Sequence, residues 1–130
     1  MFKVILAAAL LFGTTNVLAH EGHDNAPGAL KANHGGVVKS GKEINLEYVV
    51  KGDTVELYPA SHEGKDLPLA EVSLTGTAKP SKGKSAPLKL DTKNGAYLAK
   101  VDFKGAYRVE VQVVADNKGK KSTFKFQVER

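Results

Sequence analysis

Apolar and polar residues alternate through most of the chain after residue 34. The clearest example is the run 43–50. Its apolar positions are Ile44, Leu46, Tyr48 and Val50, and its polar positions are Glu43, Asn45 and Glu47. A period of two is typical of a half-buried strand. The sequence therefore predicts a strand with its apolar set in the core and its polar set in solvent.

A second strand is expected at 54–58, with Val55 and Leu57 inward, because the same alternation resumes after a turn at 51–53. The two runs together predict a hairpin. Pro59 is expected to end the second strand, since proline has no backbone N–H to donate to a strand ladder.

The rest of the chain repeats this pattern. Further strands are predicted at 37–39, 70–77, 88–90, 96–101, 106–115 and 122–128. The inward side chains expected in the longer ones are Val72, Leu74, Tyr107, Val109, Val111, Val113, Phe124, Phe126 and Val128. Residues 79–86 are rich in Lys, Ser, Pro and Gly, which is typical of a mobile loop. Seven or eight short strands joined by turn residues, without a helical pattern, favour an all-β immunoglobulin-like sandwich. A small barrel is the alternative.

The first 19 residues have the organisation of a secretory signal peptide. Lys3 precedes an apolar run at 4–12, and small residues end the segment at Ala19. An uncleaved membrane anchor is the alternative, but the apolar run is shorter than the roughly 20 residues that cross a bilayer. We therefore expect a cleaved signal peptide at 1–19, a flexible arm at 20–33, and one periplasmic β-sandwich domain at 34–130.

Composition excludes several classes of protein. The chain has no cysteine, so neither disulfides nor thiolate zinc sites are available. Its one methionine is Met1, so a thioether site for Cu(I) is also excluded. The net charge of +5 comes from lysines scattered singly among other residues. That pattern indicates a solvated surface rather than a nucleic-acid groove.

Enzyme signatures are missing from the sequence. Ser61, His62 and Glu63 are consecutive, and neighbours in sequence cannot adopt the geometry of a catalytic triad. The chain also contains no Gly-rich phosphate loop that opens a helix. We therefore expect a protein that is not an enzyme.

The four histidines are the candidate chemistry. Two of them, His20 and His23, lie with Glu21 and Asp24 in the arm. Imidazole and carboxylate suit Cu(II) and Zn(II), and Cu(II) is favoured on intrinsic affinity. If cleavage leaves His20 first, its α-amino and ring nitrogens can chelate one Cu(II) together. The alternative is that the arm is only a soluble leader. The candidate metal ligands are His20, His23, His34, His62, Glu21, Asp24 and Glu63.

Several short motifs resemble a known class of periplasmic domain. They are His34-Gly35-Gly36-Val37-Val38, the strand to Tyr48, the run 52–58 and the loop Ser61-His62-Glu63-Gly64-Lys65. Together they are similar to small immunoglobulin-like domains found alone or joined to the adaptor subunits of heavy-metal efflux pumps. Those domains open with His-Gly-Gly and later carry an Asp-His-Gly-Lys-Pro-like loop, in which Ser61 replaces the aspartate here. The likeness extends over about 33–128.

This resemblance implies a role in handling transition metals outside the cytoplasm, and it marks His34 and His62 as matching positions. The histidine-first mature end is also similar to periplasmic copper-resistance proteins, although their methionine-rich segment is absent here. We predict a periplasmic Cu(II) or Zn(II) buffer or donor beside an efflux adaptor or pump. Its affinity should fall below about pH 6.5, because neutral imidazole is the ligand. The alternative is a structural or protein-interaction module of the cell envelope, with incidental histidines.

Overall fold

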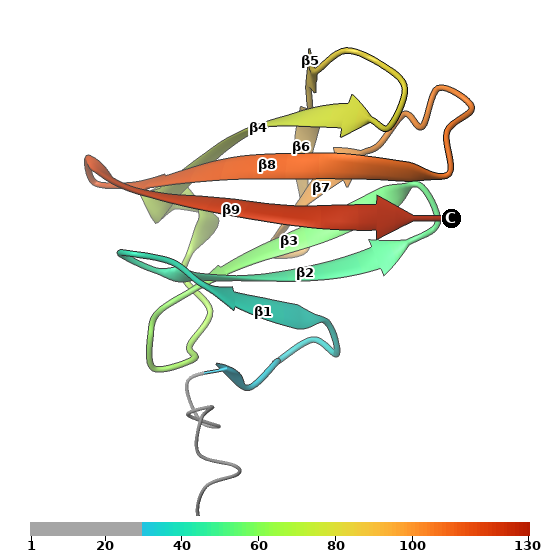
Figure 1. Cartoon of the computed structure of the whole chain (residues 1–130). Helices are drawn as coiled ribbons and strands as arrows, with labels where there is room; N and C mark the ends of the chain where they lie inside the picture. Colours follow the sequence, from blue (N-terminus) through green and yellow to red (C-terminus); the bar gives the residue numbers. More distant parts are fainter. Residues whose placement is uncertain (1–29) are drawn as a thin grey trace, which may run out of the picture.

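The computed structural model describes residues 30–130, which form nine strands in two antiparallel sheets (Figure 1). One sheet has the order β1-β2-β3-β7-β6, with bounds β1 (Val37–Ser40), β2 (Asn45–Lys51), β3 (Thr54–Ala60), β7 (Ala96–Lys100) and β6 (Lys89–Lys93). The other has the order β5-β4-β8-β9, with bounds β5 (Ala86–Pro87), β4 (Val72–Pro80), β8 (Arg108–Asn117) and β9 (Lys120–Glu129). A 3-10 turn, η4 (Leu69–Glu71), precedes β4.

The predicted β-sandwich is confirmed, with nine strands in place of seven or eight. The barrel alternative is wrong, because each sheet ends in two edge strands and the sheets do not close on each other. The additional strand is the two-residue β5, which lies at the end of the segment predicted as a mobile loop. The predicted signal peptide and most of the predicted arm, up to residue 29, lie outside the described residues.

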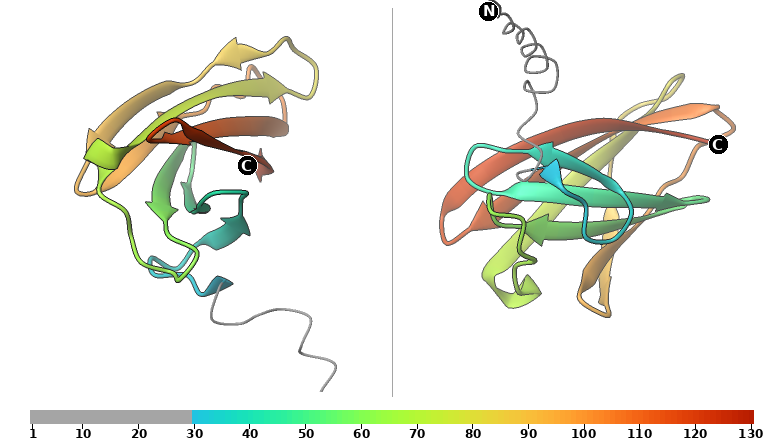
Figure 2. Two further views of the ribbon diagram at one scale, coloured as in Figure 1. Left: turned by 90° about the vertical axis from the view of Figure 1, so that its left-hand side faces the viewer. Right: turned by 90° about the horizontal axis from the view of Figure 1, so that it is seen from below.

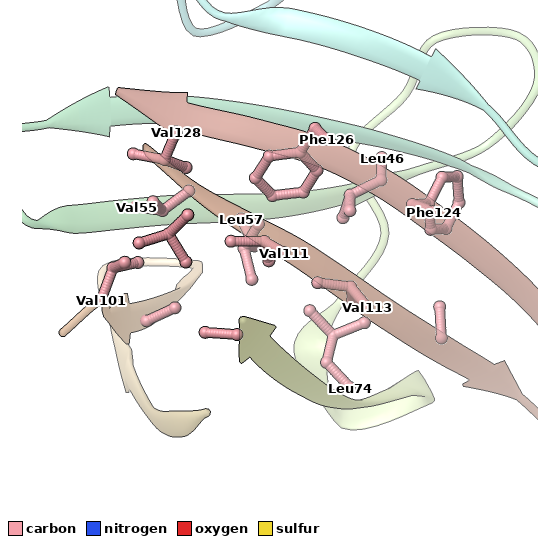
Figure 3. Close-up of a cluster of buried hydrophobic side chains, with 14 of the residues drawn as sticks. Leu46, Val55, Leu57, Leu74, Val101, Val111, Val113, Phe124, Phe126 and Val128 are labelled. Atoms are coloured by element: carbon pink, nitrogen blue, oxygen red, sulfur yellow. The ribbon is translucent and has the colours of Figure 1, made fainter. Parts of the chain in front are cut away.

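Figure 2 shows how the two sheets face each other, and the buried side chains of both form the core between them. Alternate residues of both sheets point into it, as a period of two requires. The side chains labelled in Figure 3 are Leu46, Val55, Leu57, Leu74, Val101, Val111, Val113, Phe124, Phe126 and Val128, and all are buried. The longest hairpin, β8–β9, contributes five of them and pairs without a break from Arg108 opposite Glu129 to Asn117 opposite Lys120. Within residues 30–130 no helix has the length and apolar character needed to cross a membrane.

The predicted hairpin forms, but β3 does not end at Pro59. It continues to Ala60, and Pro59 lies opposite Leu46 of β2. The Pro59 carbonyl accepts a hydrogen bond from the Leu67 N–H at 2.9 Å. The backbone polar groups of Pro59 therefore point away from β2. The missing N–H therefore removes no bond between β2 and β3, and the proline is tolerated where β7 no longer flanks β3.

Four side chains do not follow the predicted inward and outward sets. Asn45 and Glu47 are buried, although both were predicted to face solvent. Residues 33–36 lie over Glu47. Val50 is 40% exposed at the end of β2, next to the turn into β3. Tyr107 is 62% exposed, because it precedes β8 and the buried Phe103 fills that end of the core instead.

Candidate functional site

The His-Gly-Gly segment is fastened to β2 by the carboxylate of Glu47. Its Oε1 accepts hydrogen bonds from the N–H groups of Asn33 and His34 at 3.0 and 3.2 Å. Its Oε2 accepts from the N–H groups of His34 and Gly36 at 2.9 and 2.8 Å. Three nearby backbone amides, those of Asn33, His34 and Gly36, thus surround one buried carboxylate. Glu47 is only 3% exposed, so these amides supply the hydrogen bonds that burial denies it from water.

Both glycines of this segment are needed for that geometry. Gly35 has a φ of 77°, in the left-handed region that glycine adopts without a Cβ clash. At Gly36 a Cβ atom would collide with the Tyr48 carbonyl oxygen and lie 2.7 Å from a methyl group of Val49. The motif therefore lets the backbone lie flat on β2 and aim three amides at one carboxylate.

The loop at 61–66 is held against the same segment (Figure 1). The side-chain amide of Asn33 donates to the Gly64 carbonyl at 2.6 Å and to Asp66 Oδ1 at 3.3 Å. Within the loop, Gly64 N–H donates to the Ser61 carbonyl at 2.9 Å, which closes the turn. These bonds bring Asp66 beside His34, although 32 positions separate them in the sequence.

His34 is fixed by two contacts. Its Nε2 lies 2.7 Å from Asp66 Oδ2, and its ring stacks on Tyr58 with centroids 3.6 Å apart and planes 9° from parallel. The His34 side chain is 30% exposed and that of Asp66 is 48% exposed, so the pair stands at the surface. A carboxylate accepts and does not donate, so Nε2 carries the proton and the neutral ring presents Nδ1 as its free lone pair. That is how second-shell carboxylates orient histidine ligands of metals.

The Tyr58 ring of this stack is linked to Glu56 through its hydroxyl group. Partial burial raises the pKa of the Tyr58 hydroxyl, and the hydrogen bond it donates to Glu56 at 3.0 Å raises it further. Tyr58 therefore stays neutral and serves as a stacking surface rather than as a phenolate ligand. Desolvation acts to raise the pKa of Glu56, but the Tyr58 hydroxyl and the Lys51 ammonium at 3.2 Å outweigh it and hold that pKa below its ordinary value of 4.5.

His62 lies in the same loop but has a different partner. Its Nε2 is 3.0 Å from the Gly41 carbonyl oxygen, in the turn between β1 and β2. A carbonyl can only accept, so this nitrogen also carries the proton and Nδ1 is again the basic nitrogen. Glu63 beside it is exposed. Each described histidine therefore has a backbone or carboxylate oxygen that sets its tautomer.

The described residues do not by themselves complete a metal site. Across residues 30–130, no group of three or more His, Asp or Glu side chains is placed to hold an ion together. His34 and His62 contact different partners, Asp66 and the Gly41 carbonyl. The other candidate ligands, His20, Glu21, His23 and Asp24, lie outside the described residues.

Sequence reasoning missed three of the residues that build this site: Glu47, Tyr58 and Asp66. Glu47 was assigned to the solvent face of its strand, and neither Tyr58 nor Asp66 was among the candidate ligands. One usable signal was present, namely an acidic residue in the strand that follows a Gly-Gly pair, since paired glycines expose backbone amides that bind anions. The contact between His34 and Asp66 has no local signal, because it depends on how two distant loops meet.

Comparison with known proteins supports the fold alone. No family model matches the chain, and no curated protein matches it. Among solved structures, a DUF4426 family protein from Pseudomonas aeruginosa PAO1 is similar, with a TM-score of 0.57 and 23% sequence identity. The match covers 72% of this chain and 94% of that chain. It agrees with a small β-sandwich that occupies most of the described residues.

Proposed function

We propose that this protein binds a transition-metal ion, Cu(II) or Zn(II), outside the cytoplasm, with His34 as the ligand supplied by the sandwich. The observation that carries the proposal is the contact between His34 Nε2 and Asp66 Oδ2 at 2.7 Å. It fixes the tautomer and, together with the Tyr58 stack, holds the ring in one orientation. An imidazole held this way loses little rotamer freedom when it binds an ion.

The remaining ligands come from the arm in this proposal. His23 lies eleven positions before His34, and an extended chain of that length spans up to roughly 36 to 40 Å. Covalent geometry therefore allows His20 and His23 to reach the ion that His34 holds. Two arm imidazoles and His34 would supply three nitrogens, a set that suits Zn(II) or Cu(II). Glu21 and Asp24 are carboxylates available to complete the shell.

His62 is the ligand of a second site or an additional ligand of the first. Its Nε2 donates to the Gly41 carbonyl, an arrangement that prepares Nδ1 for an ion in the way that Asp66 prepares His34. Glu63 is the adjacent carboxylate. The resemblance to domains associated with heavy-metal efflux adaptors adds support, and an efflux adaptor or pump is the partner we propose.

The test is a titration of the protein, as its host cell processes it, with Cu(II) and Zn(II) by isothermal calorimetry. We expect His34→Gln to weaken binding at least tenfold. Asp66→Asn should weaken it about 10- to 100-fold, because it removes an outer-shell partner while leaving every ligand in place. Asp91→Asn, at an exposed position of β6, is the matched control. Metal affinities that are the same in all four proteins would remove His34 from the mechanism.

A protein-interaction module is the second candidate, and the sheet edges favour it. β9 is ten residues long and is the last strand of its sheet. An edge of that length can pair with a strand from a partner. A partner captured equally well by metal-free protein and by a His20, His23 and His34 triple variant would support this function over metal binding.

A further inference from the structure

A cavity beside β6, at the opposite edge of the five-stranded sheet from β1 and the His34 segment, has the composition of an anion site. It has a volume of about 290 Å³ and lies at the open side of the sandwich, where β4 and β5 of one sheet face β6 and the end of β7 in the other. In Figure 1 this is the region around the β5 label. The metal proposal uses none of its residues.

The wall of the cavity is apolar and contributes few donors. It consists of Ala78, Pro80, Ala86, Pro87 and Leu88. Neither proline has a backbone N–H. The Leu88 N–H is already used, since it donates to the Gly76 carbonyl at 2.9 Å. This wall can contact an apolar body but offers little to a polar head group.

Leu88 packs over Gly76 of β4, where there is no side chain to exclude it. A Cβ atom at Gly76 would lie 2.8 Å from Leu88 Cδ1 and 2.7 Å from the Gln112 carbonyl oxygen. The glycine therefore lets Leu88 fold down onto the sheet and pack against the core. As a result the cavity has a fixed apolar floor.

The rim of the cavity is strongly cationic. Four lysines line it, Lys84, Lys89, Lys100 and Lys104, against a single carboxylate, that of Asp102. Lys104 pairs with Asp102 at 3.7 Å, and Lys100 pairs with Asp53 at 3.3 Å.

Two of these lysines are left without a counter-charge. Within residues 30–130, no carboxylate forms an ion pair with Lys84 or Lys89. Moreover, Lys89 lies directly opposite Lys100 in the β6–β7 ladder. Like charges in that position destabilise a strand pair. Departures from such local rules are concentrated at functional sites.

We propose that this cavity binds a small amphipathic anion, a carboxylate on a short alkyl or aryl body. The anionic head lies between Lys84 and Lys89, where it relieves the repulsion between Lys89 and Lys100. The apolar body lies on Leu88 and the two prolines. The volume is at the lower end of the roughly 300 to 1,000 Å³ range of ligand pockets, which suits a short ligand rather than a long-chain lipid.

The first experiment is an NMR titration of the isotope-labelled protein with butyrate, hexanoate and octanoate. The proposal predicts saturable shifts at the Gly76 and Leu88 amides. Affinity should rise by about fourfold for each added methylene until the floor is covered, because each buried methylene contributes a comparable increment. Octanol, which has the same tail and no charge, should bind more weakly than octanoate, and high salt should weaken only the octanoate complex.

The second experiment uses the double variant Lys84→Gln and Lys89→Gln. It should bind octanoate about fivefold more weakly, which is the expected loss of two exposed ion pairs. The matched control is Lys121→Gln with Lys125→Gln, which removes two exposed charges from β9, the edge strand opposite β5 in its sheet, and should leave affinity unchanged.

Three outcomes overturn the proposal. One is equal octanoate affinity in the wild type and the Lys84 and Lys89 double variant. Another is an affinity that does not rise from butyrate to octanoate, which would show that the alkyl chain does not contact the apolar side chains of the cavity. The third is binding of polyglutamate, but not of octanoate, with the same dependence on the two lysines. That result would assign the surface to an acidic polypeptide instead. None of these results bears on His34, so the two proposals fail or stand separately.

Discussion

Replacing Glu47 with Gln tests whether one side chain holds the His-Gly-Gly segment on the sandwich. The carboxylate receives four backbone contacts, two on each oxygen, from Asn33, His34 and Gly36. Glutamine keeps one oxygen and replaces the other with an NH₂ group, which would face backbone N–H groups as a second donor. At least one buried amide is left unsatisfied, and the charge assistance of the others is lost.

The size of the effect follows from these contacts. One unsatisfied group costs about 1 to 3 kcal/mol, and weakened charge-assisted bonds add to this. The segment precedes the edge strand β1 and contributes no side chain to the core, which limits the total. We expect Glu47→Gln to lower the free energy of unfolding by about 2 kcal/mol. For a domain of this size that corresponds to a fall in melting temperature of roughly 8 to 16 °C.

Thermal unfolding followed by circular dichroism measures the loss, and amide hydrogen exchange locates it. Exchange should accelerate at Asn33, His34 and Gly36 far more than in β8. Glu110→Gln, at an exposed position of β8, is the matched control and should stay within about 0.5 kcal/mol of wild type. Wild-type stability and unchanged exchange in Glu47→Gln would refute the anchoring role of this carboxylate.

Three further predictions concern the sandwich. Leu57→Ala should destabilise the fold by about 2 to 5 kcal/mol in urea unfolding, because Leu57 is fully buried, whereas Val50→Ala should cost under about 1 kcal/mol. Gly36→Ala should destabilise by more than about 1 kcal/mol, since its Cβ meets backbone at Tyr48, and unchanged stability would contradict the close approach described. Glu56 has a lowered pKa, so its contribution is present above pH 4.5 and is lost as the pH falls through its folded pKa. Glu56→Gln should therefore be less stable than wild type by under about 1 kcal/mol at pH 7, and the difference should shrink as the pH is lowered below 4.5 in parallel urea titrations.

Alternation in the sequence was sufficient to predict the sheets where a strand has one face on the core and one in solvent. β8 and β9 fit this description, and Val109, Val111, Phe124 and Phe126 are buried as predicted. The pattern gave the wrong face for Glu47, since a period of two identifies two faces but not what covers each of them. The segment 33–36, which precedes β1, lies over the Glu47 side chain.

The positions of two candidate ligands, but not their contacts, could be predicted from the sequence. His34 and His62 lie in loops, as expected from their Gly-rich surroundings. Their partners were not predicted. The Asp66 carboxylate reaches His34 through the pairing of β2 with β3 and the turn after it, and the Gly41 carbonyl reaches His62 through the adjacent β1–β2 turn. Such contacts depend on strand order, which the alternation of apolar residues does not encode.

The anchoring of residues 33–36 on β2 gives the segment before it a fixed point of attachment. If the arm has the flexibility that the sequence predicts, the eleven positions from His23 to His34 correspond to a tether with a mean end-to-end separation of about 17 to 20 Å. A ligand on such a tether has a local concentration in the millimolar range at its attachment point. Under the metal proposal, cutting the chain between 25 and 32 would lower the apparent affinity for the ion even though every donor atom survives.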